Sequence, residues 1–211
     1  MQINYFKYFA IVFTILLMSS CYDREPRFEY KYNDKPAYSW GYADFYGDFY
    51  KYADIDRNVL TLSLFSDSLY VNNEGSLAGH GQYLFVEDIF ISATDSVLPA
   101  GVYRADTTAA PMTFYPGELF EVDENKYPVG AYLYYIEKRQ AFSTVKYISR
   151  GSFDLKRSAG DKYFIEFDFV MSDSSVVKGS FQGKLPHFDN SELQADKVRK
   201  KLKLFSEIKF Q

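Results

Sequence analysis

From Leu60 onward, apolar and polar side chains alternate along much of this chain with a period of two. Leu60, Leu62 and Leu64 alternate with Thr61 and Ser63. The same alternation recurs in three later stretches, 151–156, 163–169 and 177–184. Because successive side chains of a β-strand point to opposite faces of a sheet, a period of two predicts strands with one buried face. This pattern restricts the chain to folds built from sheets.

Short turn-forming segments separate these stretches and indicate how many strands to expect. They are rich in Gly, Pro, Asn, Asp and Ser, and they lie at 72–75, 99–101, 116–117, 158–161 and 172–174. The last two turns are short enough to make 145–185 a three-stranded antiparallel meander. Further strands are expected near 82–92, 101–106, 117–122 and 130–138. About nine strands without an intervening helix predict an all-β fold, an antiparallel β-sandwich or a barrel-like sheet.

One aromatic segment fits two kinds of secondary structure. Tyr42, Phe45, Tyr46 and Phe49 recur at the spacing of one helix face. Gly47, in the middle, would cost a helix about 1 kcal/mol, and aromatic residues are indifferent helix formers. A bent or bulged strand accommodates the glycine better. We therefore expect a strand rather than a helix over 42–50.

Aromatic residues make up 19% of the chain, with 20 Tyr, 20 Phe and one Trp. Such rings favour strands, because they pack well on pleated surfaces. Most of them are therefore expected in the core. A second role is open to Trp40, Tyr42 and Tyr46, and to the Tyr-rich stretch 132–135, because aromatic faces can stack on sugar rings. These residues are the candidate ligand-stacking site.

The first 21 residues have the layout of an export signal. Lys7 supplies positive charge, an apolar run covers 9–18, and the small residues Ser19 and Ser20 follow. Ten residues in a helix span about 15 Å, half the hydrocarbon core of a bilayer. The run is too short for a stable membrane span, so we interpret it as the centre of a signal peptide.

The end of this segment reads Met18-Ser19-Ser20-Cys21 and resembles the processing box of bacterial lipoprotein signal peptides. The resemblance implies cleavage before Cys21, a diacylglycerol on its sulfur and a further acyl chain, such as palmitate, on its new amine. Several acyl chains would anchor the protein firmly, since each buried CH₂ contributes about 0.8 kcal/mol. The alternative is an ordinary cleaved signal with an incidental free cysteine. Cys21 is the only cysteine, which excludes a disulfide framework and a cysteine-based zinc site.

These features divide the chain into four parts. Residues 1–21 form the signal peptide, 22–39 a flexible polar tether, 40–186 the β-domain and 187–211 a basic C-terminal tail. The tether would reach about 60 Å at full extension, enough to hold the domain clear of lipid headgroups. The tail fits either a short helix or a last strand.

Four short segments of the β-domain carry a second resemblance. They are Phe45-Tyr46-Gly47-Asp48-Phe49-Tyr50, Leu98-Pro99-Ala100-Gly101-Val102-Tyr103, Tyr115-Pro116-Gly117 and Lys178-Gly179-Ser180-Phe181-Gln182-Gly183-Lys184-Leu185. Together, over about 40–185, they resemble uncharacterised β-sandwich surface lipoproteins of Bacteroidota. The acidic residues just after Cys21 resemble the surface-export signals of such lipoproteins. The resemblance implies a role at the cell envelope, with no settled activity. We expect the protein to be anchored at the outer membrane and exposed at the surface.

Residues suited to catalysis or metal binding are scattered. The histidines, His80 and His187, are far from a His-x-x-x-His spacing. Acidic stretches at 54–56 and 123–125 lack the glycine and the spaced glutamate of a calcium loop, and we interpret them as solvated turns. The sequence has no Gly-x-Ser-x-Gly elbow and no phosphate-binding glycine loop. We therefore predict no enzymatic activity, no cofactor and no metal site.

The distribution of charge along the chain also bears on which kinds of partner the protein can bind. Net charge is −4, and lysine and arginine are scattered as far as the tail, which disfavours nucleic acid. The sequence predicts a non-catalytic, lipid-anchored envelope protein that binds a glycan or protein ligand or mediates adhesion. One alternative is a fimbria-like structural subunit whose edge strands pair with its neighbours. The other is a small-molecule-binding barrel or an enzyme on a similar scaffold.

Overall fold

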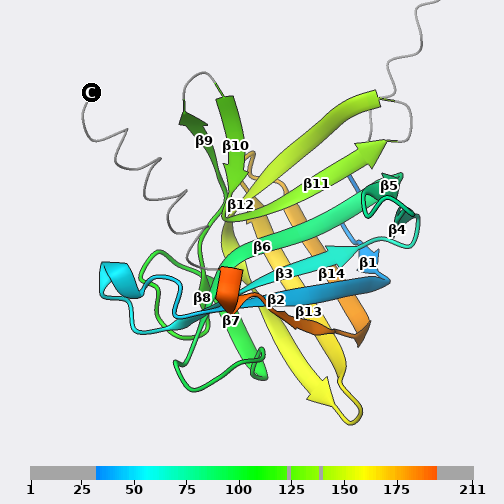
Figure 1. Cartoon of the computed structure of the whole chain (residues 1–211). Helices are drawn as coiled ribbons and strands as arrows, with labels where there is room; N and C mark the ends of the chain where they lie inside the picture. Colours follow the sequence, from blue (N-terminus) through cyan, green and yellow to red (C-terminus); the bar gives the residue numbers. More distant parts are fainter. Residues whose placement is uncertain (1–31, 123–124, 138–139, 194–211) are drawn as a thin grey trace, which may run out of the picture. The chain divides into compact units, whose positions relative to one another are not determined.

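β-Strands make up most of the part of the chain that the structure describes, as Figure 1 shows. The computed structural model describes residues 32–122, 125–137 and 140–193. Within these ranges the helical elements are two short 3-10 turns, η1 (Lys51–Ala53) and η2 (Ser191–Leu193). The predicted all-β class is confirmed. In this part of the chain, no helix has the length and apolar character needed to cross a membrane.

Several predictions concern residues outside the described ranges. These are the signal peptide over 1–21, the lipid on Cys21, the tether over 22–31 and the tail from 194 onward. The acidic pair at 123–124 also lies outside them.

Fifteen strands lie within the described residues, and each of the nine expected strands is among them. In chain order they are β1 (Ala37–Tyr38), β2 (Trp40–Gly47), β3 (Asn58–Phe65), β4 (Leu69–Val71), β5 (Leu77–Gly79), β6 (Gly81–Ile91), β7 (Gly101–Ala105), β8 (Thr113–Phe114), β9 (Glu118–Val122), β10 (Asn125–Val129), β11 (Ala131–Glu137), β12 (Gln140–Ser158), β13 (Lys162–Met171), β14 (Val176–Lys184) and β15 (His187–Asp189). The strands that the sequence does not predict are β1, β4, β5, β8, β10 and β15, each of two to five residues.

The long strands form one antiparallel wall. They pair side by side in the order β2, β3, β6, β11, β12, β13 and β14. The last three are the predicted meander. Beyond the start of β11, at Ala131, β7 and β8 take its place between β12 and β6. As a result, β6, β11, β12, β7 and β8 form a closed ring of five strands.

The first and last strands close the rest of the wall. β1 pairs in parallel with β14, where Ala37 lies opposite Ser180. β15 pairs in parallel with β2, where His187 lies opposite Ala43. β1 runs almost directly into β2, and β14 into β15. The N-terminal segment β1–β2 therefore lies beside the C-terminal segment β14–β15. On its other side, β2 pairs with β3. Of the two predicted forms, the sheet therefore has the barrel-like one.

This closure moves both boundaries of the predicted β-domain. The sequence places residues 32–39 in the tether, yet Tyr38 is buried and β1 belongs to the wall. The Ser180 N–H also donates to the Pro36 carbonyl. Likewise, residues 187–193, assigned to the tail, contain β15 and η2. β1 and β15, with two and three residues, are too short to show a period of two.

Inward-facing side chains occupy the space inside the wall. Along β13, alternate residues from Tyr163 to Met171 are buried, as the period of two predicts. The rings of Tyr103 and Phe153 stack with their centroids 4.6 Å apart, and Phe114 packs against Phe153. Burying one large apolar side chain contributes roughly 1.5–3 kcal/mol, so this core is the main source of stability.

β2 is a bulged strand, as the sequence predicts. Its register against β3 shifts between Phe45 and Gly47, which makes Tyr46 the extra residue. Gly47 has a φ of +62°, in the left-handed region that favours glycine. The strand ends there, before the turn that leads to η1. The preference for a strand over a helix is confirmed up to this residue.

Candidate functional site

A row of aromatic side chains crosses four neighbouring strands. Trp40 of β2 lies opposite Phe65 of β3. Phe65 lies opposite Tyr83 of β6, which in turn lies opposite Tyr134 of β11. Their neighbours along the strands, such as Leu64, are fully buried in the core. Because side chains alternate along a strand, the aromatic row lies on the outer side of the wall.

A second row runs beside the first, two residues further along each strand. It contains Tyr42 of β2, Ser63 of β3, Phe85 of β6 and Tyr132 of β11. We call the rings of both rows the aromatic face, and its members are Trp40, Tyr42, Phe65, Tyr83, Phe85, Tyr132 and Tyr134. The face is thus a product of strand register rather than of any one segment.

Rings of the aromatic face contact one another across the strands. Trp40 and Phe65 stack with their centroids 4.0 Å apart and their planes at 14°. The centroids of Phe65 and Tyr83 are 5.4 Å apart, and those of Tyr83 and Tyr134 are 5.1 Å apart. These distances are typical of favourable aromatic pairs. The first row is therefore a continuous ring surface.

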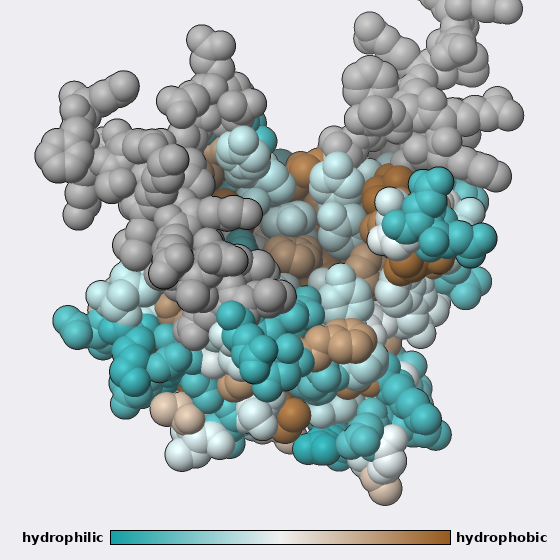
Figure 2. Space-filling view, in the orientation of Figure 1, coloured by the Kyte–Doolittle hydropathy of each residue, from teal (hydrophilic) through white to brown (hydrophobic). Residues whose placement is uncertain are grey.

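Part of this surface is open to solvent. Phe65 and Tyr132 are buried, with 5% and 9% of their surface exposed. The half-buried members are Trp40, Tyr42, Tyr83, Phe85 and Tyr134. Figure 2 looks onto the strands that carry the face and shows pale residues of intermediate hydropathy around a hollowed area. A ligand can therefore reach several rings at once.

Neighbouring groups fix and tune individual rings. The Nε1–H of Trp40 donates to the carbonyl oxygen of Leu69 at 2.8 Å, which holds the indole in one orientation. Burial raises the pKa of the Tyr83 hydroxyl, and the nearby hydroxyl of Tyr134 raises it further. The Tyr83 phenol is therefore uncharged at neutral pH and can both donate and accept hydrogen bonds.

The structure brings together two of the three residues in the predicted stacking site. Trp40 and Tyr42 belong to the aromatic face, whereas Tyr46 does not. As the extra residue of the bulge, Tyr46 leaves the alternation of β2 and meets Phe49 edge-on, with centroids 6.3 Å apart. It packs in a second cluster that includes Phe90.

Strand register also decides which other aromatic residues join the face. From the Tyr-rich stretch 132–135, Tyr132 and Tyr134 join it, while Tyr135 is a buried residue on the opposite side of β11. The sequence does not single out Phe65, Tyr83 or Phe85. The pattern Tyr83-Leu84-Phe85 carries a partial signal, because it places two rings on one side of a strand.

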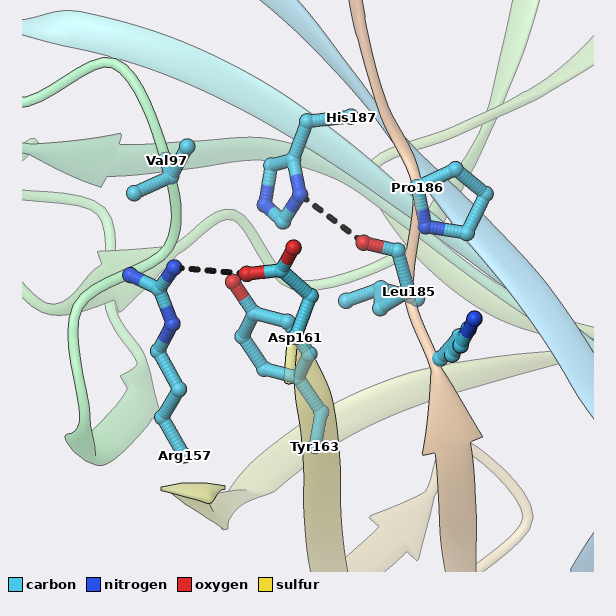
Figure 3. Close-up of a pocket in the computed structure, with 8 residues that line it drawn as sticks. Val97, Arg157, Asp161, Tyr163, Leu185, Pro186 and His187 are labelled. Carbon is cyan, nitrogen blue, oxygen red and sulfur yellow. Dashed lines mark hydrogen bonds and ion pairs between the residues drawn. The ribbon is translucent and has the colours of Figure 1, made fainter. Parts of the chain in front are cut away.

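A pocket of about 400 Å³ lies among the loop before β7, the turn between β12 and β13 and the connection from β14 to β15 (Figure 3). Its apolar lining residues are Val97, Leu185, Pro186 and the ring of Tyr163. Its polar groups come from Arg157, Asp161, Lys184 and His187. Arg157 pairs with Asp161 at 2.9 Å. The pocket shares no residue with the aromatic face.

His187 joins two of the segments around this pocket. The N–H of Leu98 donates to Nε2 of His187 at 3.3 Å, so the ring proton is on Nδ1. Nδ1 then donates to the Leu185 carbonyl at 3.0 Å. Burial lowers the pKa of His187, which favours the neutral ring that these two bonds require. The other histidine, His80, is exposed between β5 and β6.

Of the two acidic stretches that the sequence analysis weighed, the structure describes 54–56 in full. Asp54 and Asp56 are both exposed after η1. Among the residues that the structure describes, no group of three His, Cys, Asp or Glu side chains could hold a metal ion.

Comparisons of the chain with protein-family models, curated proteins and solved structures found no match. Function is therefore inferred from geometry. The aromatic face can stack on the flat apolar side of a ligand, and the pocket can enclose a small molecule beside positive charges.

Proposed function

We propose that this protein is a non-catalytic, lipid-anchored binding protein of the cell envelope, held at the outer membrane through Cys21 and exposed at the surface. Its aromatic face binds a glycan. The aromatic face is the observation that carries the binding role: two in-register rows across four strands, in which every position except Ser63 carries a ring. The lipoprotein-like segment 18–21 supports the place in the envelope.

The chemistry of the aromatic face suits a neutral sugar chain. One side of a pyranose ring presents C–H groups that stack on aromatic rings, while tyrosine hydroxyls bond to sugar hydroxyls. Neighbouring strands lie about 4.8 Å apart, so a row across four strands extends over roughly 14 Å. Several sugar units in line fit that length. Because the face consists of aromatic rings and phenol hydroxyls and contains no lysine or arginine, it favours a neutral glycan over an acidic one.

Intrinsic fluorescence gives a direct test of glycan binding. Trp40 is the only tryptophan in the chain, so its emission reports on the aromatic face. Full-length protein in detergent would be screened on a glycan array and then titrated with the neutral oligosaccharides that bind. We expect a saturable change in Trp40 emission. The Tyr134→Ala variant should bind about tenfold more weakly, which corresponds to roughly 1.4 kcal/mol.

The matched control is Tyr127→Ala. Tyr127 is 50% exposed on β10, outside the aromatic face, so this variant should bind as the native protein does. The proposal fails if no neutral glycan on the array binds. It also fails if Tyr127→Ala and Tyr134→Ala weaken binding equally.

A further inference from the structure

The pocket beside His187 has apolar walls of a size that suits a small molecule. Ligand pockets in proteins commonly measure about 300–1,000 Å³, and this one measures about 400 Å³. Val97, Pro186 and the ring of Tyr163 provide the apolar walls. Leu185, with 1% of its surface exposed, links the pocket to the main core. A ligand with an apolar body would find matching surfaces here.

Two unpaired lysines lie at or beside this pocket. Lys184 of β14 lines it, and Lys162 of β13 lies directly opposite Lys184 in the register. Both side chains are exposed, and neither forms an ion pair within the described ranges. Like charges opposite each other on neighbouring strands destabilise the sheet. A bound anion would relieve that repulsion.

A third positive charge, on Arg157, is already held in place. Its Nη2 bonds to Asp161 at 2.9 Å, and its guanidinium lies 5.7 Å from the ring centroid of Tyr163. Figure 3 shows this pair beside His187. Asp161 is the only carboxylate among the residues that line the pocket. A guanidinium has five N–H donors, so Arg157 retains donors for a second carboxylate.

We propose that this pocket binds a small organic carboxylate. Lys184 and Arg157 hold the carboxylate at the mouth, and the apolar part of the ligand packs against Tyr163 and Val97. Lysine and arginine recognise phosphate as well, but the apolar walls favour an organic acid over free phosphate. This site is separate from the aromatic face, so the inference does not depend on glycan binding.

His187 acts as a positioning residue for this pocket. Its two backbone bonds tie Leu98, which follows Val97 in the chain, to Leu185 at the end of β14. Both walls are therefore fixed before a ligand arrives, which lowers the entropic cost of binding. Because the ring is neutral, the positive charge around the pocket comes from the lysines and Arg157.

Isothermal titration calorimetry of the full chain in detergent tests the assignment, with benzoate, glucuronate and inorganic phosphate as probes. We expect one molecule of benzoate or glucuronate to bind per chain. Affinity should fall as salt rises, because exposed charges are screened. Lys184→Gln should weaken binding about tenfold, a loss typical of one charge-assisted contact, while Lys184→Arg should retain most of it. The emission of Trp40 should not change, because Trp40 does not line the pocket.

Lys178→Gln is the matched control, because Lys178 is exposed on the same strand but pairs with Asp168 at 2.6 Å and does not line the pocket. It should bind benzoate as the native protein does. Equal melting temperatures of the two glutamine variants would show that a loss of binding reflects the pocket. The inference is overturned if neither carboxylate binds, if phosphate alone binds, or if both glutamine variants weaken binding equally.

Discussion

Tyr50 and Asp88 show how a single backbone irregularity places a charged group among aromatic rings. The register of β6 against β3 shifts at this point, and Asp88 has a φ of +55°. The Tyr50 hydroxyl donates to Asp88 Oδ2 at 2.6 Å. Burial raises the pKa of Tyr50, and the charge of Asp88 raises it further. A hydrogen bond to a charged group contributes roughly 1.5–3 kcal/mol, so the pair stabilises the fold locally.

His187 makes the stability of the protein depend on pH near neutrality. Burial lowers its pKa below the ordinary value of 6.5, and the Arg157 charge also lowers it, against the opposing effect of the Leu185 carbonyl. The unfolded chain takes up this proton at a higher pH than the folded chain does. The contribution of His187 to stability is therefore fully present above the pKa of the unfolded chain, and it is lost as the pH falls through the pKa of the folded chain. We expect the urea midpoint to decrease between about pH 7 and pH 5.

Two substitutions separate this effect from other titrations. His187→Gln should remove the decrease, whereas His80→Gln should preserve it, because His80 is exposed. Carboxylates such as Asp173, whose pKa is lowered by Lys146 from an ordinary 3.8, contribute only at lower pH. Equal pH slopes in the two variants would contradict the assignment to His187.

Among the elements, strand length decides what the sequence can predict. Long strands such as β6 and β13 carry enough alternating residues to reveal their period. β1 and β15 have only two and three residues, and both pair in parallel with distant segments. No local pattern records such a pairing, and for this reason the predicted domain boundaries at 39 and 187 are displaced.

The same limit applies to the candidate sites. Trp40 and Tyr42 could be singled out because they stand close together in an aromatic segment. Phe65 and Tyr83 join them only through register, which depends on which strands pair. The pocket beside His187 combines residues from three segments, and a sequence alone does not show that these segments meet.

The bulge that ends β2 depends on the freedom of Gly47. A Cβ added there would meet its nearest neighbour, Ser191, at 3.5 Å, so there is room for a side chain. The cost of substitution is therefore conformational. Gly47→Val should lower the free energy of unfolding by about 1–2 kcal/mol, and Gly47→Asn should cost less because asparagine tolerates positive φ. Chemical denaturation measures both; equal losses would point to another cause.

At the scale of the whole molecule, we propose a barrel-like domain that is anchored to a membrane by lipid on Cys21. Cys21→Ser should abolish incorporation of labelled palmitate and move the protein from the membrane fraction to the soluble fraction. The thermal midpoint should not change, because Cys21 is the only cysteine and the described wall, from Tyr32 onward, contains none. Protease treatment of intact cells would test surface exposure. Mass spectrometry that found a mature chain starting elsewhere, or starting at Cys21 without acyl groups, would contradict the anchor.

The pairing of β1 with β14 and of β2 with β15 also sets an order of assembly. Ala37 cannot meet Ser180 until nearly the whole domain has been synthesised. Until then the edges of β1 and β2 that pair with β14 and β15 stay unpaired, and unpaired strand edges are templates for aggregation. Contacts between such distant positions also slow folding. β14 and β15 are the last strands of the described wall to be synthesised, and they pair with its first two strands. A chaperone that shields the edges of β1 and β2 would therefore help this protein most before β14 and β15 have been made.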